Sequence, residues 1–446
     1  MSDLYSSFSL KKSYHSLFHR PNSGHPVLDG FRAIGMLWVI LTHTVASAAL
    51  LMTVYLKPEV SFLGQQVDHT PWYFDWIWNG HLMVDMFFVL SGFLIAGLLL
   101  RDIDKHDGIQ LKRFYYRRFM RLMPTYLLVI ALFYMMNMPH RENLWQNLLY
   151  INNFFPHGET AAPWTWSLAI EEQFYLIFPL FALFVLRTTQ RPILWLSGLL
   201  VFACIIRLYI VWTDEILHGN QMSVSMIDKG ILNHGLTVIY DNLYTRYGAF
   251  ICGIGAQYIY HYQREKMTDF FLSTLPGKAS IFFSLVISIT LLEFNPLKSD
   301  IVLPEWAIVS FIGLYRNIFS LCIALLILAM LVNSRHVSWL TRFLSLRIWY
   351  PFAQLTYCAY LIHIPIIIVT LSILNKVYVT YDLTFYYGDY KLLIITFAVA
   401  STLTYFVSAI IYFSLERPMM TFRDLRSNAA VNPEPATIEL DKRATT

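Results

Sequence analysis

An arginine and a histidine lie on one face of the first long apolar segment of the sequence. The segment VLDGFRAIGMLWVILTHT carries Arg32 and His43, eleven residues apart. In a helix, eleven residues turn the chain about 20° beyond three full turns, so both side chains share a face, about 16 Å apart. A histidine can act as a general base and an arginine can bind an anion. The spacing equally allows an arginine that snorkels to a membrane interface and a histidine bonded in the core.

Three carboxylates are expected at the depth of this histidine. Asp85 lies in HLMVDMFFVLSGFLIAG, and Glu171 and Glu172 lie in WTWSLAIEEQFYLIFPL. Each is expected about 8–10 Å below the outer membrane surface. A carboxylate beside an imidazole fixes its tautomer and stabilises the imidazolium, which suits a general base, whereas a structural layer of ion pairs is the alternative. The catalytic candidates are therefore His43, Asp85, Glu171 and Glu172.

A dense arginine motif occurs in LKRFYYRRFMRLMP. If this segment is helical, three of its arginines form a stripe at positions i, i+4 and i+8, and such a row can grip phosphates through guanidinium forks. Any short cytoplasmic loop also needs positive charge, so it is the density of four arginines in nine residues that favours an anion site. The four arginines are Arg113, Arg117, Arg118 and Arg121, of which Arg113, Arg117 and Arg121 form the stripe.

A second histidine lies in a late apolar segment. His363, in YCAYLIHIPIII, comes two residues before Pro365. It could assist chemistry or bond a backbone carbonyl that the proline leaves free, and we favour the second role. The four cysteines all fall in apolar runs without CxxC or Cys/His spacing, so we expect neither a metal site nor a disulfide framework.

The composition places these side chains in a membrane. Of the 446 residues, 56% are hydrophobic and only 14% are charged, against about 25% charged in soluble domains. The apolar residues gather into runs of about 20, the length that spans a bilayer. The net charge of +4, without a long basic tract, excludes nucleic acid as a partner. The sequence therefore predicts an all-α polytopic membrane protein in contact with the lipid bilayer.

About ten transmembrane helices are predicted, with both termini in the cytoplasm. Threaded in this way, the cytoplasmic segments hold 23 lysines and arginines and the outer segments hold six, which is the bias of the positive-inside rule. We divide the chain into a cytoplasmic N-terminal segment, 1–26, a transmembrane domain, 27–415, and a cytoplasmic tail, 416–446, expected to be disordered. The ten helices are expected at 27–50, 80–100, 122–138, 165–186, 192–213, 238–260, 279–293, 307–332, 348–373 and 391–415.

These strings, taken in order, resemble acyltransferase family 3, the multi-span membrane enzymes that O-acylate bacterial envelope glycans and other molecules. The later strings TYCAYLIHIP and ERP match weaker motifs, with Ala353 and Thr356 where the family commonly has glycine and serine. Many relatives carry an esterase-like domain after the last helix, whereas about thirty mostly polar residues follow it here, so we expect a stand-alone form. The stronger matches run through Arg32, His43, Asp85, Phe87, Phe88, Ser91, Gly92, Phe93, Arg117, Arg118, Arg121, Pro124, Trp166, Ser167, Glu171, Glu172, Gln173, Phe174 and Tyr175.

The resemblance implies transfer of an acyl group, foremost acetyl, from cytoplasmic acyl-CoA to a hydroxyl of an extracytoplasmic glycan or glycolipid, such as lipopolysaccharide O-antigen. It implies the cytoplasmic (inner) membrane, no tightly bound cofactor, and acetyl-CoA as co-substrate. The pantetheine arm would then follow the face shared by Arg32 and His43, and His43 would be the general base, oriented by Glu171, Glu172 or Asp85. The acyl-CoA-binding candidates are Arg32, Arg113, Arg117, Arg118 and Arg121.

Two alternatives stay open. A polytopic transporter or flippase could use the buried charges as a substrate or proton relay, although the sequence shows no internal repeat of the kind that marks many transporters. The other polytopic O-acyltransferase family has its catalytic histidine in a late helix, in which case His363 would matter most.

Overall fold

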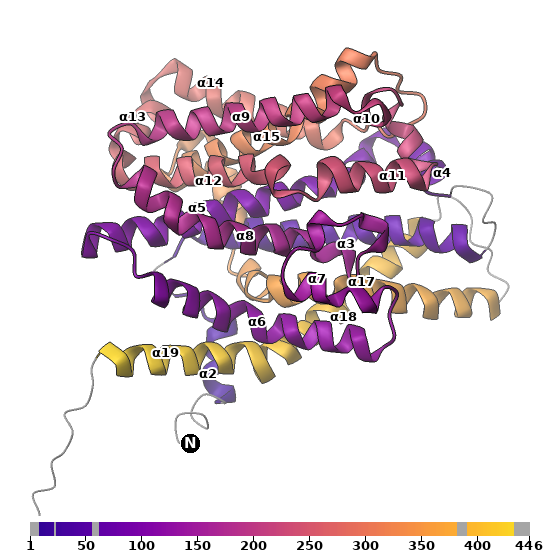
Figure 1. Cartoon of the computed structure of the whole chain (residues 1–446), viewed down its shortest axis with the longest axis horizontal. Helices are drawn as coiled ribbons and strands as arrows, with labels where there is room; N and C mark the ends of the chain where they lie inside the picture. Colours follow the sequence, from indigo (N-terminus) through magenta and orange to yellow (C-terminus); the bar gives the residue numbers. More distant parts are fainter. Residues whose placement is uncertain (1–8, 22–23, 56–61, 381–389, 432–446) are drawn as a thin grey trace, which may run out of the picture.

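Long helices run side by side through the whole structure (Figure 1). This computed structural model describes residues 9–21, 24–55, 62–380 and 390–431. Across these ranges the secondary structure is helical and no strand is formed. The prediction of an all-α polytopic membrane protein is confirmed.

Nine helical spans in the described part of the chain are long and apolar enough to cross a membrane. Each of them overlaps one of the ten predicted segments, because an apolar run of about 20 residues has no other way to satisfy its backbone in lipid. The helices that make them up are α3 (Pro26–Tyr55), η1 (Trp72–His81) with α5 (Leu82–His106), α6 (Leu111–Met135), α8 (Trp166–Phe181) with η6 (Ala182–Leu186), α9 (Pro192–Thr213), α14 (Leu275–Glu293), α15 (Glu305–Leu331), α17 (Trp349–Thr380), and α18 (Tyr390–Ile411) with η10 (Tyr412–Glu416) and α19 (Arg417–Val431).

The remaining predicted segment, 238–260, forms helix α12 (Leu243–Tyr262), which falls short of the apolar composition of the other nine. It carries Arg246 and Gln257, and both side chains are buried. Helix α12 packs most extensively on α5 and also contacts α9 and α15. Its 20 residues rise about 30 Å, which matches the hydrocarbon core. A helix enclosed by other helices can carry polar residues because protein, rather than lipid, surrounds it.

Two glycines bring α5 and α12 into close contact. A Cβ atom on Gly92 would collide with the backbone of Phe250, and one on Gly253 would collide with the backbone of Val89. Small residues at such positions let helix backbones approach in a membrane. This contact fixes the relative position of the polar residues that the two helices carry.

The two ends of the bundle can be told apart by their connections (Figure 1). We call the end at which α5 joins α6, at residues 107–110, the arginine end, and the opposite end, where α9 joins α10 (Glu215–His218), the far end. Helices α2 (Leu10–Phe18), α13 (Arg264–Ser273) and α19 lie at the arginine end, and α4 (Phe62–His69) and α11 (Lys229–Gly235) lie at the far end. The placement of the arginine end in the cytoplasm stays a prediction.

Contacts tie both ends of the described chain to the arginine end. The hydroxyl groups of Ser16 and Tyr412 lie 3.1 Å apart, and Arg117 of α6 pairs with Asp424 of α19 at 3.5 Å. The prediction of a disordered tail from residue 416 is wrong for its first part, because α19 continues the helix to Val431 and packs on α6. The rest of that tail, 432–446, lies outside the described residues.

Candidate functional site

A cavity of about 410 Å³ lies between helices α3, α5, α6, α8 and α17. Four arginines line it: Arg32, Arg101, Arg118 and Arg121. Ser167 and Tyr360 line it as well. Helix α8 runs from the far end toward the arginine end, so Ser167 lies about 12 Å deeper than Tyr175, eight residues later. The cavity, hereafter the arginine cavity, therefore leads from a cationic opening to polar groups deep in the bundle.

The structure separates the four arginines of α6 into two pairs. Arg118 and Arg121 line the arginine cavity, and the Arg118 guanidinium lies over the Tyr175 ring, 5.4 Å from its centroid. Arg113 is exposed and donates to the Gln110 side chain, and Arg117 pairs with Asp424. The predicted stripe of Arg113, Arg117 and Arg121 therefore does not form one binding row. Residues at i and i+4 share a helix face, but only the last stripe member is deep enough to reach the cavity.

Arg101 lines the arginine cavity, whereas Arg113 and Arg117 do not. It lies near the end of α5. In the sequence it is indistinguishable from the other basic residues that the positive-inside rule requires in this loop. Burial, together with the nearby Arg101 and Arg264 guanidinium groups, lowers the pKa of His25, so this neighbouring imidazole is neutral at neutral pH. The positive charge at the opening therefore comes from the arginines.

Glu171 belongs to the wall of the arginine cavity. Its Oε1 atom accepts a hydrogen bond of 2.6 Å from the Ser91 hydroxyl and another from the Tyr175 hydroxyl. Arg32 and Arg118 both lie close enough to this carboxylate to interact with it electrostatically. Glu171 is thus placed to balance the arginines and not to contact His43.

Glu172 turns away from the cavity. Successive helical residues point about 100° apart, so adjacent glutamates meet different neighbours. Glu172 is not among the residues that line the arginine cavity, and it lies instead near Tyr126 and Tyr150. The expectation that both glutamates act together at one centre is therefore not met by the geometry.

His43 is paired with His363, across helices α3 and α17. The His43 Nδ1 and His363 Nε2 atoms lie 3.0 Å apart, and the two ring centroids lie 5.0 Å apart. His363 is fully buried, and its Nδ1 atom lies 2.7 Å from the Tyr360 carbonyl oxygen. The sequence favoured a bond from His363 to the carbonyl that Pro365 leaves free, which is that of Leu361, four residues earlier. This prediction is wrong in the partner, because the Leu361 carbonyl accepts from the Trp164 indole and His363 bonds Tyr360 instead.

These contacts assign the tautomers of both histidines. A carbonyl oxygen can only accept, so His363 Nδ1 carries a proton and donates it to Tyr360. In a neutral imidazole the other nitrogen is then bare, so His363 Nε2 accepts from His43 Nδ1–H. The proton on His43 Nδ1 leaves His43 Nε2 with a free lone pair. A neutral imidazole held in this tautomer is the arrangement that a general base requires.

Asp85 does not orient His43. Its carboxylate lies between two arginines, at 3.2 Å from Arg246 Nη1 and 2.7 Å from Arg316 Nη1, and all three side chains are buried. The expectation that Asp85 is a carboxylate partner of His43 is corrected by these contacts. Asp85 lies on the side of α5 that faces α12 and α15.

Tyr360 separates the arginine cavity from the histidine pair. Its hydroxyl donates to the Trp164 carbonyl at 2.7 Å and accepts from the Ser167 hydroxyl at 2.5 Å. His363 follows Tyr360 by three residues on α17, about 4.5 Å farther along the axis. The cavity thus ends at a tyrosine that stands about one helical turn short of the histidines.

Comparison with protein families decides among the classes that this geometry allows. The model of acyltransferase family 3, described as an acyltransferase domain, matches residues 25–413. The chain belongs to acyltransferase family 3. The matched residues include the four arginines of the cavity, Glu171, and both histidines of the pair.

Individual relatives match over shorter stretches. The peptidoglycan O-acetyltransferase OatA of Listeria monocytogenes is 36% identical over 165 residues, which are 32% of this chain and 26% of OatA. Nose resistant to fluoxetine protein 6 of Caenorhabditis elegans is 27% identical over 379 residues, which are 75% of this chain and 44% of that protein. The chain thus spans less than half the length of these relatives. No solved structure gives a significant match.

Proposed function

We propose that this member of acyltransferase family 3 transfers an acyl group, foremost acetyl, from acyl-CoA to a hydroxyl group of a cell-surface glycan. The observation that carries the proposal is the arginine cavity, which leads from four arginines to Tyr360, about one helical turn short of the histidine pair. The donor enters from the cytoplasm at the arginine end, and the acceptor, a glycan or glycolipid such as lipopolysaccharide O-antigen, approaches from the far end. The protein then resides in the cytoplasmic (inner) membrane.

Arginines bind the phosphate groups of acyl-CoA, and the walls of the cavity contact its pantetheine arm. The phosphate groups of coenzyme A meet Arg101, Arg118 and Arg121, since guanidinium groups form paired hydrogen bonds with phosphate oxygens. The volume of about 410 Å³ suits the pantetheine arm, with the nucleotide remaining at the opening. Leucine side chains between the two ends of the cavity contact the apolar part of the arm. Neither a metal ion nor a resident cofactor takes part in this scheme.

Acyl transfer then follows at the histidine pair. His43 Nε2 takes the proton of the acceptor hydroxyl, and the oxygen attacks the carbonyl carbon of the thioester. The tetrahedral intermediate collapses, the carbon–sulfur bond breaks, and the His43 imidazolium returns the proton to the coenzyme A thiolate. Tyr360 has to rotate away from Ser167 to admit the thioester. The pantetheine arm then fills the path that Tyr360 has left, which keeps water from the thioester.

The arginine cavity makes a prediction that separates donor binding from membrane topology. Arg118→Ala and Arg121→Ala should each raise the KM for acetyl-CoA roughly 10-fold or more, with a smaller change in kcat, because each removes charged hydrogen bonds far from the thioester. Arg113→Ala is the matched control, since it removes an arginine of the same helix that lies outside the cavity. Acetyl-CoA titration of the purified variants measures the effect. An equal rise in the KM for acetyl-CoA in all three variants would mean that the helix needs positive charge in general and that Arg118 and Arg121 form no specific donor site.

His363 is proposed as a positioning residue that fixes the His43 tautomer. His363→Leu should lower kcat by about 10- to 100-fold, as when imidazoles that bind metals lose their orienting partner. His363→Gln should restore much of the rate, because its amide oxygen can still accept from His43 Nδ1–H. Initial rates at saturating acetyl-CoA measure both. If the glutamine and leucine variants are equally slow while both bind acetyl-CoA normally, His363 serves packing and not the tautomer.

A further inference from the structure

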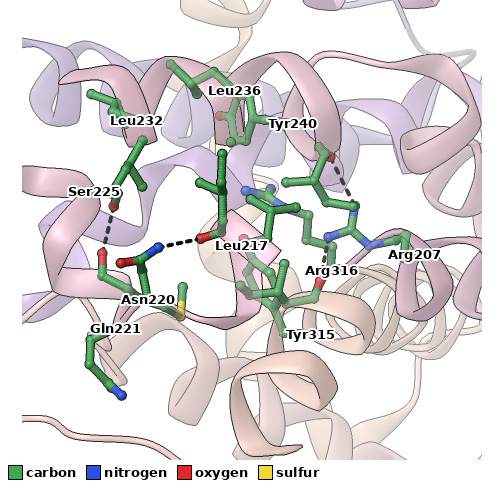
Figure 2. Close-up of a pocket in the computed structure, with 16 residues that line it drawn as sticks. Arg207, Leu217, Asn220, Gln221, Ser225, Leu232, Leu236, Tyr240, Tyr315 and Arg316 are labelled. Atoms are coloured by element: carbon green, nitrogen blue, oxygen red, sulfur yellow. Dashed lines mark hydrogen bonds between the residues drawn. The ribbon is translucent and has the colours of Figure 1, made fainter. Parts of the chain in front are cut away.

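A second, smaller cavity lies at the far end of the bundle (Figure 2). Its volume is about 160 Å³, and it is lined by residues of α9, α10, η7 (Met222–Met226), α11, η8 (Leu236–Tyr240) and α15. Figure 2 shows Arg207, Arg316 and Tyr240 gathered on one side, and Asn220 and Ser225 on the other. We call this space the far-end cavity. None of its lining residues takes part in the donor site.

The charges beside the far-end cavity do not balance. Three buried arginines, Arg207, Arg246 and Arg316, come from three different helices and lie around the single carboxylate of Asp85. Asp85 pairs with Arg246 and Arg316 only. Asp241 adds one further buried carboxylate nearby, which is bonded to His157 at 2.6 Å and interacts electrostatically with Arg246, so three guanidinium groups face two carboxylates. Buried charges in proteins are ordinarily paired, so an excess of guanidinium groups calls for another anion.

Arg207 has a structural role that leaves its charge uncompensated. Its guanidinium donates to four backbone carbonyls, those of Ile239, Thr245, Ile312 and Gly313, at 2.5–3.4 Å. Figure 2 shows two of these bonds. They use four of the five N–H groups of the guanidinium while adding no negative charge. The Arg207 charge therefore remains in the wall of the cavity.

Arg246 and Arg316 have hydrogen-bond donors that Asp85 does not occupy. The Nε and Nη2 atoms of Arg246 are buried without a hydrogen-bond partner among the described residues. Arg316 lines the far-end cavity between the rings of Tyr240 and Tyr315, at 4.7 and 4.8 Å from their centroids. Tyr240 also lies over the Arg246 guanidinium, which places it between the cavity and the buried cluster. A guanidinium stacked in this way keeps its edge available for an oxyanion.

We propose that the far-end cavity binds an anionic group of the acceptor, the carboxylate of an acidic sugar or the phosphate of a glycolipid, with Arg316 as its main contact. The inference rests on the proposed acyl transfer, since it names the chemical class of the acceptor. Tyr240 contacts Trp166, whose neighbour Ser167 bonds Tyr360 at the end of the arginine cavity. An anion held beside Arg316 thus anchors the acceptor near the layer in which the donor arm ends.

Gly235 offers a way to test this site without disturbing Asp85. It lines the far-end cavity at the end of α11, and an added Cβ atom would make an ordinary contact of 3.7 Å with Leu217. Gly235→Asp places a carboxylate in the cavity, and Gly235→Asn is its neutral counterpart of equal size. Arg316→Gln would be the more direct change, but it also removes a partner of Asp85.

Calorimetric binding of D-galacturonate and glycerol 3-phosphate, with D-galactose and glycerol as neutral controls, tests the site on the purified full chain. Wild type and Gly235→Asn should bind one or both anions and neither neutral compound. Gly235→Asp should bind the same anion with an affinity that is lower by roughly 10-fold or more. The preferred anion distinguishes an acidic sugar from a phosphate. Equal binding of anion and neutral control by wild type, binding of neither anion, or equal anion affinity in the Asp and Asn variants would overturn the proposal.

Acetyl-CoA binding in the same samples keeps the two proposals separate. All three proteins should bind acetyl-CoA equally, because the far-end cavity and the arginine cavity share no lining residue. If wild type binds the anion but does not bind acetyl-CoA, the proposed function is contradicted and the anion site is not. If Gly235→Asp is too unstable to purify, the wild-type comparison of anion with neutral control decides alone.

Discussion

His43→Ala is expected to lower the rate of acetyl transfer by about 10²–10⁴, the usual contribution of a positioned general base. Acetyl-CoA binding should persist, because the arginines that are proposed to hold the donor lie at the other end of the cavity. The physical reason is the free lone pair on His43 Nε2, which exists because Nδ1 donates to His363. Without the imidazole, no base remains at the position of His43, and the His363 ring lies 5.0 Å away from it, centroid to centroid.

The measurement is single-turnover transfer from radiolabelled acetyl-CoA in purified protein. His336→Ala is a suitable control, since this exposed histidine lies outside the arginine cavity and the histidine pair. A His43→Ala variant with half of the wild-type rate would remove His43 from the role of general base. A variant that loses acetyl-CoA binding as well would indicate misfolding.

Asp85→Asn is expected to cost about 3–5 kcal/mol of folding stability, the range found when one partner of a buried ion pair is removed. The carboxylate holds Arg246 and Arg316 together in the buried interior, and the amide would leave both guanidinium charges uncompensated. Thermal unfolding in detergent measures the effect, with the exposed Asp300→Asn as the control. If the two variants unfold at the same temperature, the Asp85 cluster does not hold α5, α12 and α15 together.

The helical spans were predictable because lipid imposes a length and a composition on each of them. Segment 238–260 shows the limit of that rule. It was recognisable by its length, but its buried Arg246 and Gln257 lower its hydropathy, and the packing of α12 on α5, α9 and α15 explains why a membrane tolerates them.

The partners of the candidate site residues could not be predicted from depth. Position along a helix fixes the layer in which a side chain lies, but not which other helix it faces. Asp85 meets Arg246 and Arg316, 161 and 231 residues away, and His43 meets His363, 320 residues away. Each pairing depends on the arrangement of the helices around the bundle axis, and the spacing within one segment carries no information about that arrangement.

Local geometry was more informative where a single helix decides the outcome. The adjacent residues Glu171 and Glu172 must point about 100° apart, and only Glu171 lines the arginine cavity. Likewise, the stripe of Arg113, Arg117 and Arg121 gives a shared face but says nothing about how far that face extends into the cavity. Arg101 was hidden among residues that the positive-inside rule already explains.

Sealed vesicles of known orientation test the central claim most directly. Acetyl-CoA supplied only to the arginine end should acetylate an acceptor confined to the far end, with coenzyme A released on the donor side. Arg32→Ala should impair this transfer, because Arg32 lines the arginine cavity through which the pantetheine arm passes. The predicted result is product on the far side alone and none when the donor is supplied there. Transfer only when both substrates are on the arginine side would contradict the account, even though the protein would still be an acyltransferase.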